Sequence, residues 1–226
     1  MKFLLTGRLV TNLNDVMQGK SPRTPSFDRI ARKPGTLRGL IKDTQGKPVP
    51  GARVLARASA FGGLGSSASA TSDARGYYEI PLPRGIARVW CGGVAVPYQG
   101  VRLALSLHPA DGVLDDFVVK DGGIEHFVLR TWGVVSPDAI ADNPIYSGNY
   151  YGGSFTVNYS TREADDENAL KSWLILGSTI ELQMIPVGLL LDGSIGEALV
   201  VRQKLDGNVY FQVNNVPIGR YKIQAV

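Results

Sequence analysis

Hydrophobic and polar residues alternate along several short stretches of the chain, and turn-forming residues separate these stretches. In the first clear example, Leu37 and Ile41 share one face while Arg38 and Lys42 occupy the other. A period of two residues is typical of a β-strand with one buried face. The same alternation recurs at 77–82, 101–107, 180–184 and 209–213. Short alternating strands between Gly, Pro and Asp turns predict an all-β protein.

The segment 36–92 has a more specific arrangement. A strand at 36–43 is followed by a turn at 43–47, a second strand at 49–56, a turn at 73–76 and a third strand at 77–82. This order resembles the carboxypeptidase regulatory-like domain, which implies an Ig-like or transthyretin-like (prealbumin-like) β-sandwich of seven strands. The resemblance implies a scaffold or binding unit rather than an enzyme. The metal-binding histidines and glutamate of the zinc peptidases have no counterpart here.

The C-terminal part of the chain repeats this pattern. Residues 204–225 mirror the Asp-x-x-Gly-Tyr-Tyr block of residues 73–85, and they also resemble the closing strands of collagen-binding-adhesin B-type repeats. We therefore predict a second, diverged β-sandwich and an internal repeat as its origin. The predicted organisation is an extended basic arm at 1–35, a carboxypeptidase regulatory-like sandwich at 36–94 and a second sandwich at 95–226.

At most one short helix is expected. Asp165 or Asp166 can cap it, and Leu170, Trp173 and Leu174 share a face with Ala169 by three- and four-residue spacing.

The segment 59–70, Ser-Ala-Phe-Gly-Gly-Leu-Gly-Ser-Ser-Ala-Ser-Ala, is rich in small residues. It lies where the resembled family has a short connection, so we expect a long flexible loop. A mobile contact loop and a tolerated insertion both fit it.

Charge is distributed unevenly along the 226 residues. Residues 1–40 carry eight basic and two acidic side chains, a net charge of +6, whereas the remaining residues have a net charge of −2. Prolines at 22, 25 and 34 disfavour a helix here, so an extended arm is predicted, with a short strand at 3–10. The residues assigned to an assembly role in this arm are Arg8, Phe27 and four further cations: Arg23, Arg29, Arg32 and Lys33.

Three interpretations of the arm remain open. It is a solvated tail, a nucleic-acid contact, or a docking segment for a neighbouring subunit. The near absence of aromatic residues argues against base recognition, and we expect no nucleic-acid partner. Acidic clusters at 111–121 and 163–167 offer complementary surfaces, which favours docking.

Composition limits the chemistry that is possible. The chain has one cysteine and two histidines, so it cannot form a disulfide framework, a multi-thiolate metal site or a three-histidine site. Cys91 and His126 could in principle form a nucleophile and base, but a buried unreactive cysteine is favoured. We expect no catalytic residue, no cofactor and no metal site, and no secretion signal or apolar run long enough to span a membrane.

A tyrosine-rich segment at 143–155 is a candidate recognition surface. Tyrosine, Asn, Ser and Gly together supply rigid contact area and adaptable hydrogen bonds. The candidate binding residues are Tyr146, Tyr150, Tyr151 and the nearby Trp132. Tyrosines that simply pack on the sandwich are an equal alternative.

These features favour a non-enzymatic subunit of a large assembly, with other protein subunits as partners. The predicted setting is a phage virion, as a decoration, tail or fibre-attachment component docked through the arm. The alternative is a carbohydrate-binding accessory module, or an adhesion module that binds a surface glycan, in an extracellular or cell-surface location.

Overall fold

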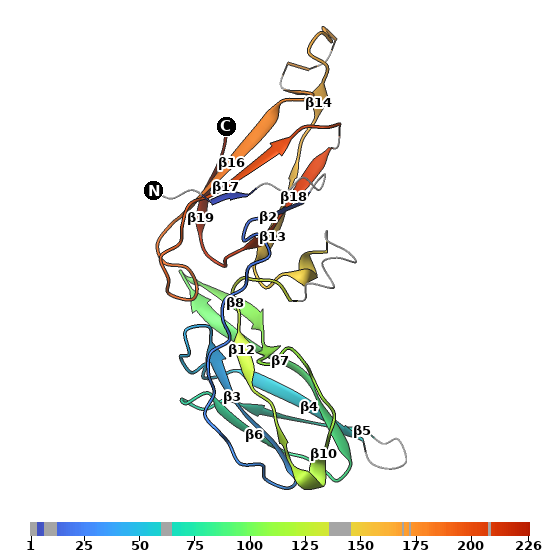
Figure 1. Cartoon of the computed structure of the whole chain (residues 1–226), viewed down its shortest axis with the longest axis vertical. Helices are drawn as coiled ribbons and strands as arrows, with labels where there is room; N and C mark the ends of the chain where they lie inside the picture. The colour runs from blue at the N-terminus through green and yellow to red at the C-terminus, as the bar shows by residue number, and fades with distance from the viewer. Residues whose placement is uncertain are drawn as a thin grey trace. The chain divides into compact units, whose positions relative to one another are not determined.

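The computed structural model describes residues 4–6, 13–59, 65–135, 146–168, 170–171, 173–207 and 209–226. These residues form β-strands and two short 3-10 helices, η1 (Val119–Asp121) and η2 (Ser147–Asn149), as Figure 1 shows. The predicted all-β class is therefore confirmed. The chain divides into two compact units. Unit 1 comprises Met1–Pro22 and Thr131–Val226, and unit 2 comprises Arg23–Arg130.

Unit 2 is a sandwich of two five-stranded sheets. Its strands are β3 (Thr36–Asp43), β4 (Arg53–Ser59), β5 (Gly65–Thr71), β6 (Tyr77–Pro81), β7 (Ile86–Tyr98), β8 (Val101–Ser106), β9 (His108–Pro109), β10 (Phe117–Val118), β11 (Gly123–Ile124) and β12 (Phe127–Leu129). One sheet has the order β10-β7-β4-β5, with β8 also paired to β7. The other has the order β11-β3-β12-β9, with β6 also paired to β3.

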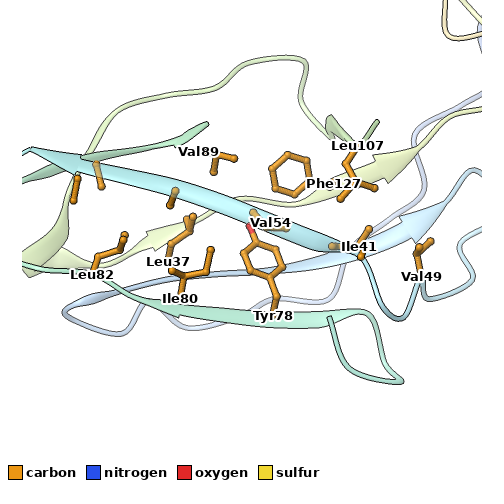
Figure 2. Close-up of a cluster of buried hydrophobic side chains, with 14 of the residues drawn as sticks. Leu37, Ile41, Val49, Val54, Tyr78, Ile80, Leu82, Val89, Leu107 and Phe127 are labelled. Atoms are coloured by element: carbon orange, nitrogen blue, oxygen red, sulfur yellow. The ribbon is translucent and has the colours of Figure 1, made fainter. Parts of the chain in front are cut away.

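The core of unit 2 lies between these two sheets. Ile41 and Phe127 from one sheet pack in the same cluster as Val54 and Val89 from the other, and Figure 2 shows these side chains converging. Fully burying such a side chain stabilises the fold by roughly 1.5–3 kcal/mol. Tyr78 is also buried, and its hydroxyl donates a hydrogen bond to a backbone carbonyl. Alternation along β3, β4 and β6 thus positions the apolar face that the sequence predicts.

Unit 1 is built around a second core. Its strands are β1 (Leu4–Thr6), β2 (Leu13–Asp15), β13 (Gly153–Asn158), β14 (Thr161–Arg162), β15 (Leu174–Ile175), β16 (Thr179–Pro186), β17 (Leu199–Lys204), β18 (Tyr210–Val216) and β19 (Tyr221–Ala225). The sheet orders are β1-β17-β16-β19 and β13-β18-β2, and β14 pairs with β15 in a separate ribbon. Met184, Val201 and Phe211 are among the fully buried residues between the two larger sheets.

The N-terminal segment contributes strands to unit 1. β1 pairs with β17 and β2 pairs with β18, both in parallel. The strand predicted at 3–10 is described only at Leu4–Thr6. Val16 follows β2 and is completely buried in the core of unit 1. These pairings join residues nearly 200 positions apart, which a sequence pattern read locally does not reveal.

The predicted boundaries at 35/36 and 94/95 differ from the boundaries of the two units. Strand β7 runs through residue 95, and β8 pairs with it along its second half. Strand β12 then pairs with β3 in parallel, so the chain up to Arg130 completes the first sandwich. The second core consequently begins only at Thr131 and includes the first residues of the chain.

Two local predictions also need correction. The expected helix after Asp165 is wrong, because the described residues there form turns and lead into β15. The Gly/Ser/Ala segment is not a loop throughout, because Gly65–Thr71 forms β5 and pairs with β4 over its whole length. Small side chains lower β-propensity but do not prevent pairing, and Ala68 and Ala70 pack against the core.

Candidate functional site

The cationic part of the arm, residues 23–35, runs along its own sandwich as an extended segment that we call the strap. Phe27 stacks on His126 with ring centroids 4.6 Å apart and an interplanar angle of 12°. The Lys42 ammonium lies 5.3 Å from the centre of the Phe27 ring and donates a 2.9 Å hydrogen bond to the Ser26 carbonyl. The strap is therefore attached through one aromatic side chain and through its own backbone.

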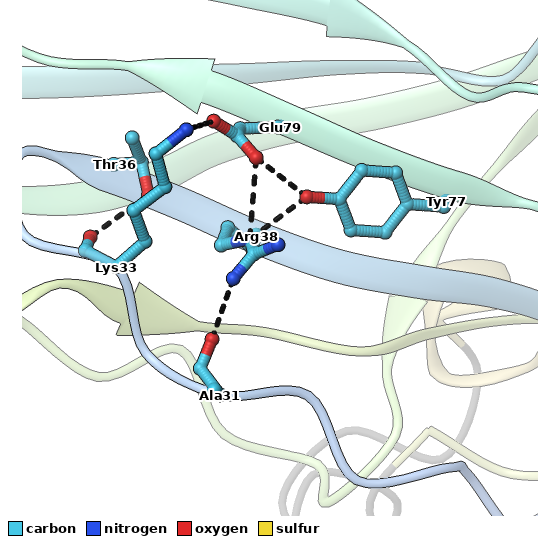
Figure 3. A network of polar contacts seen from close by, with 6 residues as sticks. All are labelled: Ala31, Lys33, Thr36, Arg38, Tyr77 and Glu79. Carbon is cyan, nitrogen blue, oxygen red and sulfur yellow. Dashed lines mark hydrogen bonds and ion pairs between the residues drawn. The ribbon is translucent and has the colours of Figure 1, made fainter.

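A second attachment point lies four to six residues after Phe27, at Ala31 and Lys33 (Figure 3). Lys33 pairs with Glu79 at 2.6 Å, and the Arg38 guanidinium donates a 2.7 Å hydrogen bond to the Ala31 carbonyl. Arg38 also donates to the Tyr77 hydroxyl at 2.8 Å, and that hydroxyl donates to Glu79 at 2.6 Å. The two strands β3 and β6 thus hold the end of the strap through a connected polar network.

The charges of this network reinforce one another. The hydrogen bond from Lys33 is the largest cause that lowers the pKa of Glu79 below its ordinary value, and the Tyr77 hydroxyl adds to it. Burial, followed by the hydrogen bond to Glu79, raises the pKa of Tyr77. The hydrogen bond to Tyr77 is the first cause that raises the pKa of Arg38. At neutral pH the network therefore contains two cations, one carboxylate and a neutral phenol.

The outer side of the strap carries positive charge. Arg23, Arg29 and Arg32 are exposed, and none of them forms an ion pair or hydrogen bond with the described part of the chain. Phe27 is half-buried, and Lys33 is paired inward. Of the residues assigned to assembly, Arg8 lies outside the described residues. The strap is therefore attached on its inner face and carries three exposed guanidinium groups, at Arg23, Arg29 and Arg32.

The structure separates Cys91 from the histidine considered as its base. The backbone of Cys91 pairs with Leu55 in one sheet, whereas His126 precedes β12 in the other sheet. The Nδ1 atom of His126 accepts a 3.1 Å hydrogen bond from the backbone N–H of Leu40, and its ring is stacked on Phe27. Burial, followed by the charge of Lys42, lowers the pKa of His126. Its ring is thus committed to holding the strap.

Two ionisable groups beside the strap have strongly shifted pKa values. Burial and the charges of Asp111 and Asp115 raise the pKa of Glu125 to about 8. Burial and the charge of Arg130 lower the pKa of His108 to about 4. Within the described ranges, no three His, Cys, Asp or Glu side chains are grouped as a metal ion would require. These shifts therefore bear on the pH dependence of unit 2.

The tyrosine-rich segment is organised by backbone pairing in unit 1. Tyr150 bridges to Val134, and the N–H of Tyr151 donates to the Gly133 carbonyl at 2.9 Å, which brings the segment beside Trp132. Tyr146 is 61% exposed, whereas Tyr150 is only 6% exposed. Tyr151 and Trp132 are half-buried. Of the predicted binding residues, Tyr146 offers most of its side chain to a ligand and Tyr150 almost none.

The attachment residues of the strap were not predicted as functional. The sequence pattern assigns Arg38 and Lys42 only to the outward face of β3, and it offers His126 only as a possible base for Cys91. One signal for these contacts was present in the sequence. Arg38 and Lys42 are four residues apart on the same outer face of β3, and their charged groups need either polar partners or solvent. Their actual partners are backbone carbonyls of a segment with no repetitive structure, and residue types do not reveal such pairings.

Other proteins resemble the chain in part. No curated protein sequence matches it. Among solved structures, the TIE protein of Bacillus anthracis is 13% identical with a TM-score of 0.32, over 85% of this chain and 28% of that chain. A streptococcal ancillary pilin is 14% identical with a TM-score of 0.28, over 85% of this chain and 53% of that chain.

The shaft pilin SpaA of Lactobacillus rhamnosus GG, as its D295N mutant, is 11% identical with a TM-score of 0.27, over 86% of this chain and 87% of that chain. The chain thus spans about a quarter and about half of the length of the first two proteins. Among the described residues, no helix has the length and apolar character needed to cross a membrane.

The family comparison concerns unit 2. Residues 36–95 match the family model of the carboxypeptidase regulatory-like domain. This match covers the strands from β3 to the middle of β7, and so includes the strand and turn pattern that the sequence shows. The proposed second copy in unit 1 lies outside the matched residues. Residues 36–95 are therefore similar to the carboxypeptidase regulatory-like domain, as the strand and turn pattern predicts.

Proposed function

We propose that this protein is a non-enzymatic interaction subunit of a large assembly, and that the outer face of the strap binds a neighbouring subunit. The observation that carries the proposal is the two-sided strap. Its inner face is held by Phe27 and Lys33, while the guanidinium groups of three further residues are exposed. The backbone of the strap is already held against the sandwich, so binding need not order it again, and arginine is enriched in protein interfaces.

The partner is expected to be acidic, because a surface with three uncompensated guanidinium groups attracts carboxylates and repels cations. A solvated tail does not fit residues 13–35, since these residues pair or pack with their own chain. The match of residues 36–95 to a domain that serves as a scaffold or binding unit supports an interaction role. The finer proposal is a virion component, as a decoration, tail or fibre-attachment protein.

Sedimentation of particles from the native source tests this function. We expect the chain to sediment with megadalton particles. We also expect mass spectrometry to detect its peptides in purified virions. Recovery solely at the mass of a 24.3 kDa monomer contradicts the proposal. Deleting residues 1–35 is unsuitable as a test, because the deletion also removes β1, β2 and the buried Val16.

The carbohydrate-binding alternative rests on Tyr146, which is 61% exposed and lies against the backbone of Gly148. A glycan array compares the two functions directly. The glycan-binding module at a cell surface is favoured by two results together: the chain binds a glycan and Tyr146→Ala abolishes this binding, and the chain is never found in particles. Absence of glycan binding together with particle association favours the structural subunit.

A further inference from the structure

The charged surfaces of the two units complement each other. Four acidic side chains, Glu163, Asp165, Asp166 and Glu167, lie in the turns between β14 and β15, and all are exposed. The β14–β15 ribbon projects from the two larger sheets of unit 1 (Figure 1). We call the described residues of 163–175 the acidic tip. The cations at the tip are Lys171 and the preceding Arg162, whose guanidinium donates to the Glu163 and Ala164 carbonyls, so the four carboxylates outnumber the positive charges.

The other acidic cluster is partly paired within unit 2. Asp116 pairs with Arg88 at 2.7 Å, and Asp121 pairs with Lys120 at 3.3 Å. Asp111 and Asp115 form no ion pair within the described residues, and their negative charges help to raise the pKa of the half-buried Glu125. The carboxylates of the acidic tip form no ion pair within the described residues, which leaves them available to cations from another chain.

The acidic tip also carries exposed apolar side chains. Leu170 is 61% exposed and Trp173 is 41% exposed, and both strand residues of β15 are also exposed. Trp173 lies six residues after Glu167, and an exposed indole suits arginine, whose planar guanidinium can stack on the ring face. Lysine lacks the planar group that such stacking requires. The acidic tip therefore matches the guanidinium groups of the strap in charge and offers an exposed ring for stacking.

The spacing of the two surfaces is compatible. Arg29 and Arg32 are three residues apart on an extended segment, so their Cα atoms lie at most about 10 Å apart. The four carboxylates lie between Glu163 and Glu167, whose Cα atoms are four residues apart and so at most about 14 Å from each other. Two guanidinium groups can therefore meet two different carboxylates of one tip. Several simultaneous pairs are needed, because a single exposed ion pair contributes only about 0–1 kcal/mol.

We infer that the partner of the strap is the acidic tip of a second copy of this chain. This inference rests on the proposed function and names its partner. The strap and the tip are different surfaces, so each copy contacts one neighbour through its strap and another through its tip. A head-to-tail contact of this kind generates a closed ring or an open filament. The chain thus carries both halves of its own assembly contact.

Charge reversal on the full chain tests the inference. In the strap variant, Arg29→Glu is combined with Arg32→Glu, and in the tip variant, Asp165→Lys is combined with Glu167→Lys. Sedimentation velocity over a concentration series should show that each variant self-associates at least about tenfold more weakly than the unaltered chain. Arg84→Glu combined with Arg102→Glu is the control for net charge, since both residues are exposed and lie outside the strap. Circular dichroism checks that all variants are folded.

Mixing the two variants provides the decisive comparison. The acidic strap of one variant then faces the basic tip of the other, and each remaining contact has the original charges. We expect the mixture to recover concentration-dependent assembly, and added salt to weaken it. Assembly that is unchanged in either variant, or a mixture that stays monomeric, overturns the inference. Two results separate this inference from the proposed function. A chain that enters particles but does not self-associate supports the function and contradicts the strap-to-tip contact. A chain that self-associates through strap and tip but is never found in particles supports the contact and contradicts the function.

Discussion

The Phe27 ring lies almost parallel to the imidazole of His126, with centroids 4.6 Å apart, and joins an irregular N-terminal segment to the first sandwich. The same imidazole accepts the backbone N–H of Leu40. One side chain thus connects β3, the approach to β12 and the strap. The stacking therefore attaches the segment that carries Arg23, Arg29 and Arg32 to the sandwich.

Removing the ring should loosen the strap without unfolding the sandwich. Stacked aromatic pairs contribute about 1 kcal/mol, so Phe27→Ala should increase the open population of the strap about fivefold. Trypsin cleavage after Arg23, Arg29 and Arg32 should accelerate accordingly. Tyr146→Ala is the matched control, since Tyr146 belongs to unit 1 and is mostly exposed. Equal cleavage rates in the two variants would argue against the attachment by stacking.

Acid should destabilise unit 2 through His108. Burial and Arg130 lower the pKa of His108 to about 4 in the folded state, from 6.5 when unfolded. Between these values the unfolded state binds the proton and the folded state does not, so stability falls as the pH decreases through this window. The loss from this group reaches about 3 kcal/mol. Urea unfolding measures the free energy of unfolding at each pH. Between pH 7 and pH 4 this free energy should fall less in His108→Gln than in the unaltered chain, and an equal fall in both proteins would contradict the role of His108.

Glu125 should have the opposite pH dependence. Burial and two aspartates raise the pKa of Glu125 to about 8 when folded, from 4.5 when unfolded. Because the folded state holds this proton more tightly than the unfolded state, proton binding at Glu125 stabilises the fold. This stabilisation is complete below pH 4.5 and is lost as the pH rises toward 8. Glu125→Gln should stabilise the protein at pH 8.5 relative to the unaltered chain and have a smaller effect at pH 5. If Glu125→Gln changes the free energy of unfolding by the same amount at pH 5 and pH 8.5, the raised pKa of Glu125 is not the cause of the change.

Asn215 should be critical for unit 1. It is completely buried, has a positive φ of 62°, and accepts a 2.6 Å hydrogen bond from the Gly133 N–H. Its amide donates to Asp15 at 2.9 Å, which ties β2 to β18. Asn215→Ala should lower the free energy of unfolding by about 2–4 kcal/mol. Asn215→Gly, which tolerates the positive φ, should recover about 1 kcal/mol of this loss in chemical denaturation.

Gly39 should not accept any side chain. A Cβ atom at this position would overlap the carbonyl oxygen of Glu125 and the ring of Tyr78. Gly39→Ala should therefore destabilise unit 2 by about 1–3 kcal/mol or prevent its folding. Gly65→Ala is the control, since nothing lies within 4 Å of its added Cβ. Thermal unfolding of the two variants makes this comparison, and similar melting temperatures would contradict the predicted overlap.

Local pattern was sufficient for the fold class and for the first sandwich. Alternation in β3 and β6 identifies the faces that carry Leu37, Ile41 and Ile80, because a strand that buries one face must place apolar residues at every second position. The turns at Asp43 and Asp73 follow from aspartate side chains that accept backbone N–H groups further along the turn, from Lys47 and from Tyr77 respectively. The helix predicted near Trp173 failed because three- and four-residue spacing also occurs by chance in short turns.

The sequence by itself determined that this protein is all-β, that residues 36–95 resemble a carboxypeptidase regulatory-like domain, and that the excess positive charge lies near the N-terminus. Only the tertiary structure decided that β1 and β2 complete the sheets of unit 1 and that Phe27 and Lys33 are attached to unit 2. Residue types set local conformation, whereas pairing between distant segments depends on which surfaces the folded chain brings together. The division of the cations into inward and outward groups is a result of that folding.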